Sequence, residues 1–415
     1  MIVEDEPKRV TYALHFAKGA RYRPVADEAR RTVYDLTPSL GRATLTEMVQ
    51  THGAVGGVNG DYFQFATEVS ADPIDLMVRR GELISHPGGE GIRQFAWGWG
   101  RDGFVVEKPT WHGEVKLPGG PVALASINSY AVEKGLTLST ASAGYAISKK
   151  PATFLVLDVG SATLRPTGRV EGRAVQTVED AERVPVRAGT MVLAGQEGRE
   201  TLRAVKKGAK VRIESVTTGF DWKRVDNAIG GGPALVEKGV ALVRGDTVRN
   251  PRTAVGVDAQ GGIWYVVIDG RQAMSVGTTF DETATTMLRL GCVDAMNLDG
   301  GGSSSIQLFG LTMNRPSGGV ERQIANGILW YGPRPGRPRG YAIKAGPIRV
   351  GTDARLTLVD PKGKPLPVEK IVWSAMGAAW IEGDGLLHPL ELGETTVRAL
   401  VDGATYEARL MVGAP

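Results

Sequence analysis

Short apolar runs, separated by turns rich in glycine, dominate the hydrophobic and polar pattern of the chain. Their length and their content of β-branched residues favour strands over helices. A stretch at 66–125 that is rich in Gly, Trp and Pro is expected to be irregular, with hairpins. The pattern predicts an α+β fold in which strands predominate. The clearest strand candidates are 10–16, 32–36, 152–159, 210–216 and 263–268.

Two stretches have the period of an amphipathic helix. Thr44 and Glu47 have the spacing of a capping box, in which each residue satisfies the backbone of the other. Thr279 and Glu282 repeat that spacing, and Gly291 stands where a C-terminal cap is expected. Each helix is therefore predicted to begin directly after its threonine.

The domain organisation follows from length and from one marked boundary. A chain of 415 residues exceeds the roughly 250–300 residues that one hydrophobic core supports, so more than one domain is expected. A linker rich in Pro, Arg and Gly at 333–340 separates 8–332 from 341–415, where short alternating strands are typical of a β-sandwich. Within the first part, about 101–220 is expected to be a β-rich insertion.

Composition and charge narrow the classes of partner. The net charge of +4 is small, and the Lys and Arg residues are scattered, so nucleic acid is not an expected partner. No apolar run reaches the roughly 18–20 residues of a membrane span. The single Cys292 excludes an intrachain disulfide and is expected to be a buried thiol. The N-terminus lacks the pattern of a signal peptide, which leaves a cytoplasmic protein, or an exported one whose signal is absent.

The candidate chemistry centres on the loop at 297–305. Glycine makes up 56 of the 415 residues, about twice its ~7% share, and three glycines follow Asp299 in this loop. Consecutive glycines allow a backbone to approach a ligand closely, and successive N–H groups form an anion-binding nest. A flexible linker is the alternative, but apolar strands are expected on both sides, at 294–298 and 306–309. The residues predicted to bind an anion here are Gly300, Gly301, Gly302, Ser303 and Ser304.

Several further polar residues follow or precede apolar runs. Each has a structural explanation as well, because Asn-Gly and Gly-Gly pairs are common turns and a lone arginine is usually on the surface. A fixed guanidinium at a strand end can also grip a phosphate through two hydrogen bonds. These candidates are Asn59 and Asp61, Gly231 and Gly232, Arg252 and Thr253, and Asp269 and Arg271.

Taken together, these stretches resemble the phosphodiester glycosidase family, in the family's order and over most of 8–332. The first stretch has Asp61 where the animal member has glycine. The tail at 341–415 is similar to bacterial immunoglobulin-like domains of cell-surface proteins, so export is expected. The stretches that carry the family resemblance are 58–63, 229–235, 252–256, 267–271 and 295–304.

The resemblance implies hydrolysis of a sugar 1-phosphodiester at the anomeric C–O bond, on a cell-surface glycan or a teichoic-acid-like polymer. Asp299 and Asp61 are expected to activate water or to stabilise an oxocarbenium-like sugar, and Asp269 to orient them. Calcium is the divalent cation that such oxygen ligands would suit. A metal-dependent phosphodiesterase and a glycan-binding protein without turnover are the alternatives. The residues expected to bind the substrate and its phosphate are Asn59, Gly231, Gly232, Arg252, Thr253, Arg271 and 300–304.

Overall fold

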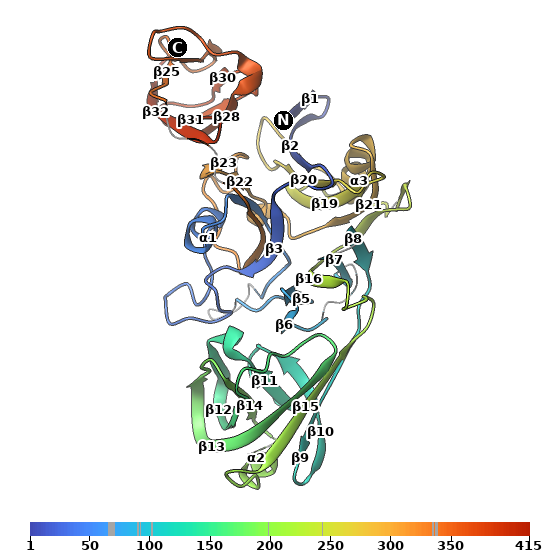
Figure 1. Ribbon diagram of the computed structural model, residues 1–415. Helices are drawn as coiled ribbons and strands as arrows, with labels where there is room; N and C mark the ends of the chain where they lie inside the picture. Colours follow the sequence, from blue (N-terminus) through green and yellow to red (C-terminus); the bar gives the residue numbers. More distant parts are fainter. Residues whose placement is uncertain are drawn as a thin grey trace.

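The computed structural model describes residues 1–64, 71–88, 91, 93–100, 103–197, 199–242, 244–333, 336 and 339–415. Strands account for 50% of the chain and helices for 8%, which confirms the predicted strand-rich class. Figure 1 shows a green barrel at one end of the molecule, the C-terminal residues in red at the other, and the remaining sheets between them. Part of the predicted linker and all of 65–70 lie outside the described residues.

The largest sheet of the central part positions most of the candidate site. Its strand order brings the N-terminal strands β1 and β2 beside strands that lie more than 230 residues further along the chain. Its central strands β19 and β20 are almost entirely buried, as their apolar runs predict. In order, the strands are β1 (Ile2–Asp5), β2 (Lys8–Phe16), β20 (Ile263–Ile268), β19 (Arg252–Asp258), β21 (Cys292–Asn297), β17 (Ala234–Glu237) and β18 (Val240–Ala241).

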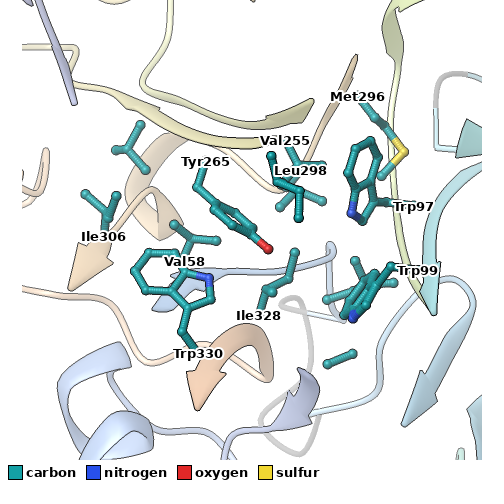
Figure 2. Packing of buried hydrophobic residues seen from close by; sticks show 14 of the residues in the cluster. Val58, Trp97, Trp99, Val255, Tyr265, Met296, Leu298, Ile306, Ile328 and Trp330 are labelled. Carbon is teal, nitrogen blue, oxygen red and sulfur yellow. The ribbon is translucent and has the colours of Figure 1, made fainter. Parts of the chain in front are cut away.

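Two five-stranded sheets complete the central part, and a shared core joins all three. Figure 2 shows Tyr265 of the large sheet beside Trp330, with Trp97 and Val58 in the same cluster. The ring centroids of Tyr265 and Trp330 lie 5.0 Å apart. One sheet runs β23 (Leu311–Thr312), β22 (Ile306–Leu308), β4 (Gly56–Asn59), β24 (Asn326–Tyr331) and β3 (Arg23–Glu28). The other runs β6 (Glu82–Ser85), β5 (Met77–Arg79), β16 (Val225–Gly231), β7 (Phe95–Gly100) and β8 (Gly103–Glu107).

A closed barrel occupies most of the region that the sequence marks as an insertion. Its alternating apolar residues fill the interior, with Leu155, Leu193 and Ile213 fully buried, and this core continues to Val78 and Leu83 of the neighbouring sheet. The two ends of this segment enter and leave the barrel as neighbouring strands. Around the barrel the order is β10 (Gly120–Ile127), β11 (Leu136–Ser139), β14 (Thr190–Gly195), β12 (Tyr145–Asp158), β13 (Gly168–Pro185), β15 (Lys210–Thr217) and β9 (Trp111–Leu117).

The C-terminal residues form three small sheets around a separate core that includes Trp373 and Leu387. The immunoglobulin-like assignment of this part stays a prediction. The first sheet pairs β25 (Ala342–Lys344) with β27 (Thr357–Val359). The second runs β26 (Ala354–Arg355), β30 (Leu386–Pro389) and β29 (Ala379–Ile381), and the third runs β28 (Val372–Gly377), β31 (Gly393–Val401) and β32 (Ala404–Val412).

Both predicted helices form, with the predicted capping boxes. Thr44 and Glu47 cap α1 (Leu45–His52), and Thr279 and Glu282 cap α3 (Phe280–Arg289). Gly291 follows the C-cap of α3 and adopts a left-handed φ of +86°. A further short helix is α2 (Arg199–Arg203), and three single 3-10 turns are η1 (Ala141–Ala143), η2 (Gly301–Ser303) and η3 (Val368–Lys370).

One prediction about local structure was wrong. The run at 32–36 is a loop, since Val33 and Tyr34 are buried by bonding to the backbone of Ser142 and Ala143 and not by pairing in a sheet. Tertiary packing, and not the local pattern, decides the conformation there. The hairpins expected in 66–125 are present as the pairs β5–β6, β7–β8 and β9–β10, and the segment holds more strand than the irregular structure predicted for it.

Candidate functional site

The site forms where the large sheet ends. Strand β19 begins at Arg252 and runs antiparallel to both neighbours, so its start lies beside the ends of β20 and β21. Arg252 faces Ile268, which precedes Asp269, and Ala254 faces Asn297, which precedes the glycine loop. Residues far apart in the sequence therefore meet at one edge.

The backbone of the glycine loop is largely engaged by the protein itself. The N–H of Gly300 donates to Asp299 Oδ1 at 2.8 Å, and that of Gly301 donates to the carbonyl oxygen of Pro251 at 2.8 Å. These bonds fold the loop into a tight turn. The predicted nest of three free amides is therefore wrong for Gly300 and Gly301, because an N–H that is donated inside the fold is not available to an anion.

The second glycine turn is a packing contact. The N–H of Gly232 donates to the carbonyl oxygen of Asn297 at 2.7 Å, and its own carbonyl oxygen accepts from Tyr62 Oη at 3.0 Å. A Cβ on Gly231 would lie 2.7 Å from the Asn297 carbonyl oxygen. Glycine is required here for close approach of β16 to β21. Because the Gly232 N–H is already donated within the protein, the prediction that it binds phosphate is corrected.

The side chains of Asn59 and Thr253 fix the glycine loop through hydrogen bonds. Asn59 Nδ2 donates to the Asp299 carbonyl oxygen at 2.7 Å, and Asn59 Oδ1 accepts from Thr253 Oγ1 at 2.7 Å and from the Ser305 N–H at 3.1 Å. Their exposed fractions are 1% and 0%. Direct substrate contact does not fit this burial, and we assign both residues to positioning the loop.

Arg252 is turned into the protein. Its Nε donates to the Thr278 carbonyl oxygen at 3.0 Å and its Nη2 to the Val248 carbonyl oxygen at 3.1 Å, while the guanidinium lies 3.8 Å above the Phe280 ring. Burial lowers the pKa of this guanidinium. The predicted grip on phosphate is not available in this arrangement, because the side chain is used to hold the start of α3.

Two other guanidinium groups lie directly on the glycine loop. A Cβ on Gly301 would lie 3.2 Å from Arg271 Nη2, and a Cβ on Gly302 would overlap the guanidinium of Arg322. Arg271 is exposed and binds Asn250 Oδ1 through its Nε and Nη2. With Gly302, the two arginines line a cavity of about 320 Å³. Arg271 was predicted; Arg322 was missed, because it is a lone arginine with no motif around it.

Asp299 lies beside this cationic patch. Burial raises the pKa of Asp299 to about 6, although hydrogen bonds from Ser303 and the Gly300 N–H and the charges of Arg322 and Arg93 act in the opposite direction. Asp299 supplies the only carboxylate of the loop at 297–305, and this carboxylate lies near the guanidinium of Arg322. Ser303 and Ser304 are 1% and 2% exposed, so Ser303 supports the carboxylate and neither serine presents an open hydroxyl.

Asp61 belongs to a second group of buried carboxyls. The N–H of Asp75 donates to Asp61 Oδ2 at 3.0 Å, and the N–H of Asp61 donates to Asn326 Oδ1 at 2.6 Å. Burial, the charge of Asp75 and the charge of Asp299 raise the pKa of Asp61 well above its usual value. Glycine is needed at Gly230, because a Cβ there would lie 2.6 Å from Asp61 Oδ2. Sequence reasoning missed Asp75, which follows no recognisable motif.

Asp269 supports the site from the next strand. Its Oδ1 accepts from Asn314 Nδ2 at 3.1 Å and its Oδ2 from the Arg315 N–H at 3.0 Å. The same Asn314 Nδ2 donates to the Ser304 carbonyl oxygen at 3.1 Å. Burial raises the pKa of Asp269 to about 7. Asp269 thus touches the loop only through Asn314, a position that suits the orienting role expected of it.

The structure offers no ready metal centre. Within the described ranges, no three His, Cys, Asp or Glu side chains are grouped so as to hold an ion. The expected calcium ion therefore stays a prediction. In the same ranges no helix has the length and apolar character needed to cross a bilayer. Cys292 is buried as predicted, and burial raises the pKa of its thiol to about 12.

Fold and site together define a strand-rich protein with a half-buried carboxylate and two arginines around a glycine loop. Residues 166–331, less than half of the chain, match the model of the phosphodiester glycosidase family. The match confirms the resemblance for 229–235, 252–256, 267–271 and 295–304, whereas 58–63 lies outside it. The expected class of enzyme, a glycosidase acting on phosphodiesters, agrees with this match. The matched range contains Asp269, Arg271, Asp299 and Arg322.

Similar proteins and structures extend the comparison. The chain is 37% identical over 79 residues to the SPbeta prophage-derived uncharacterized protein YomE of Bacillus subtilis, which covers 19% of this chain and 12% of that protein. A hypothetical protein from Synechocystis has a similar structure, with a TM-score of 0.63 at 17% identity, over 80% of this chain and 61% of that one. A Burkholderia pseudomallei structure described as a candidate exported protein gives 0.63 at 20% identity, over 78% and 74%. At these identities the likeness establishes the fold alone.

Proposed function

We propose that this protein hydrolyses a sugar 1-phosphodiester at the anomeric C–O bond, releasing the free sugar and a phosphate monoester. The observation that carries the proposal is the placement of Arg271 and Arg322 against Gly301 and Gly302, with the half-buried Asp299 beside them. Two fixed cations at a cavity suit a phosphodiester, and a carboxylate near them suits attack by water. The family match supports the same class of substrate.

The pKa shifts divide the work between the two carboxyl groups. Asp299, with a pKa of about 6, is mostly ionised at neutral pH and accepts the proton of the attacking water. The pKa of Asp61 is raised well above its usual value by burial and by neighbouring carboxylates, which favours the role of a hydrogen-bond donor for this group. The C–O bond at the anomeric carbon breaks, and its electron pair leaves with the phosphate. Arg271 and Arg322 stabilise the charge that develops there.

Hydrolysis in labelled water tests the bond that is cleaved. Cleavage of a sugar 1-phosphodiester in H₂¹⁸O should place the label in the released sugar, since water attacks carbon. Label in the phosphate would overturn the proposal in favour of a phosphodiesterase that breaks the P–O bond. The same assay in EDTA tests the predicted calcium ion. Loss of activity that calcium restores would show that hydrolysis requires the metal.

A binding protein without turnover is the remaining alternative. It predicts tight binding of the polymer and no release of sugar or phosphate monoester by the purified chain. The substrate proposed here is a cell-surface glycan or a teichoic-acid-like polymer, with the protein exported to the cell envelope. A screen of such polymers, with fractionation of native cells, tests both parts of this proposal.

A further inference from the structure

The segment 315–322 separates two cavities. On one side is the 320 Å³ cavity of Arg271 and Arg322. On the other is a cavity of about 260 Å³, which includes Gln272, Met274 and Arg315. Ser317 lines both cavities. Arg271 and Gly318 line the first cavity, and the residues that follow them, Gln272 and Gly319, line the second. The two cavities therefore adjoin along this segment.

The far wall of the second cavity comes from the C-terminal part of the chain. Leu390 and Glu391 line it, directly after β30. This wall is held in place, because Arg315 Nη2 donates to the Gly377 carbonyl oxygen at 3.2 Å and Ser374 Oγ donates to the Thr312 carbonyl oxygen. The other end of the segment is anchored where Glu321 Oε2 accepts from the Thr46 N–H at 2.9 Å.

The charges of the two cavities differ. The first holds the guanidinium groups of Arg271 and Arg322, and its one carboxylate, Glu321, already accepts hydrogen bonds from Thr46 and Thr312. The second holds one opposite pair of charges, the exposed carboxylate of Glu391 and the guanidinium of Arg315, whose Nη2 is donated to the Gly377 carbonyl oxygen. A phosphate is attracted to the first cavity and repelled by Glu391, whereas hydroxyl groups can donate to that carboxylate.

We propose that the second cavity is a subsite for the alcohol part of the phosphodiester, a hydroxyl-rich sugar or polyol chain that continues from the phosphate. Ligand pockets usually have volumes of roughly 300–1,000 Å³. The first cavity lies at the lower end of that range and the second lies below it, whereas the two together fall within it. The C-terminal part thereby contributes to substrate choice. This inference rests on the proposed function, because it takes the phosphate to lie at the glycine loop.

Two substrates separate the subsite from the chemistry. One is a methyl ester of a sugar 1-phosphate, which fills only the first cavity. The other carries the same sugar 1-phosphate esterified to a neutral trisaccharide, which is long enough to reach the second and brings only hydroxyl groups to it. Wild-type kcat/KM is measured for both. The subsite predicts a higher value for the long substrate, since additional contacts add binding energy.

The variants act on the second cavity from its exposed rim. Ala273→Trp should fill it and lower kcat/KM for the long substrate about tenfold, while the value for the short one stays within about twofold. Glu391→Ala should lower only the long-substrate value, by about threefold. Glu394→Ala is the matched control, because Glu394 is exposed on the same part of the chain and lines neither cavity.

The outcomes distinguish the two proposals. Equal effects on both substrates, or no effect of Ala273→Trp on the long one, would overturn the subsite and leave the proposed function standing. If the wild-type chain hydrolyses neither substrate, the proposed function fails and the subsite fails with it. A circular dichroism spectrum and melting temperature like those of the wild type establish that each variant is folded.

Discussion

At the scale of single residues, the same amino acids that mark the site in the sequence turn out to have unequal tasks. Arg271 lines the cavity and Asp299 lies near its arginines, whereas Asn59, Thr253 and Gly232 are buried and bonded to the loop or to its strand. A motif selects residues that must be present together, and it does not distinguish those that meet the ligand from those that hold them in place.

Replacement of Asp299 by Asn should lower kcat by about 10²–10⁴-fold, because the amide cannot accept the proton of the attacking water. The amide is nearly isosteric and can still accept the hydrogen bond from the Gly300 N–H. The melting temperature should therefore stay close to that of the wild type. Steady-state kinetics on a sugar 1-phosphodiester check this, and a variant with wild-type kcat would contradict the role of Asp299.

The pH dependence of kcat should follow the same carboxyl group. Since the pKa of Asp299 is raised to about 6 and the ionised form is the active one, kcat should rise with pH through about 6. It should fall about tenfold for each pH unit below that point. A profile measured from pH 4 to 8 tests this. Activity that increases towards acid would mean that Asp299 acts in its protonated form.

At the scale of elements, the glycine loop depends on what packs against it. Gly302→Ala places a Cβ where the Arg322 guanidinium lies, and the guanidinium, as the end of a flexible side chain, should be displaced. KM should rise about tenfold, the effect of one lost charged hydrogen bond, with little change in melting temperature. Gly346→Ala is the control, because nothing lies within 4 Å of its Cβ position. Equal KM values for the two variants would contradict the placement of Arg322 at the substrate.

Asn314, which follows the hairpin of β22 and β23, provides a second test of how the glycine loop is held. Asn314→Ala removes hydrogen bonds to Asp269, the Ser304 carbonyl oxygen and the Ile306 N–H, so the free energy of unfolding should fall by about 2–4 kcal/mol. Because these bonds fix the loop, kcat of the folded protein should fall as well.

Asn128→Ala serves as the matched control for this variant. Asn128 is also 2% exposed and makes three hydrogen bonds, with Ile84 and Thr140, at the edge of the barrel. Asn128→Ala should lower the free energy of unfolding, measured in urea, by a similar amount and leave kcat unchanged. If both variants lose activity in proportion to stability, Asn314 has no specific role in the site.

At the scale of the whole molecule, the C-terminal part is joined to the central part by a buried contact. Trp380 is 3% exposed within the central core cluster, and its Nε1 donates to Tyr12 Oη at 3.4 Å. Trp380→Ala should cost about 3–5 kcal/mol and separate one calorimetric transition into two. Limited proteolysis should then cut at 333–340, the boundary proposed from the sequence. A single transition, shifted as a whole, would mean that other contacts couple the two parts.

The sequence by itself determined the strand-rich class, both capped helices, the family and the loop that carries Asp299. These follow from local periodicity, capping chemistry and glycine runs, which act over a few neighbouring residues. Only the tertiary structure decided which amides are already bonded, that Arg252 turns inward, and that Asp75 and Arg322 join the site. Those outcomes depend on contacts between separate segments of the chain, such as Gly232 with Asn297 and Arg252 with Thr278, where burial and hydrogen-bond competition, and not sequence pattern, set each group's partner.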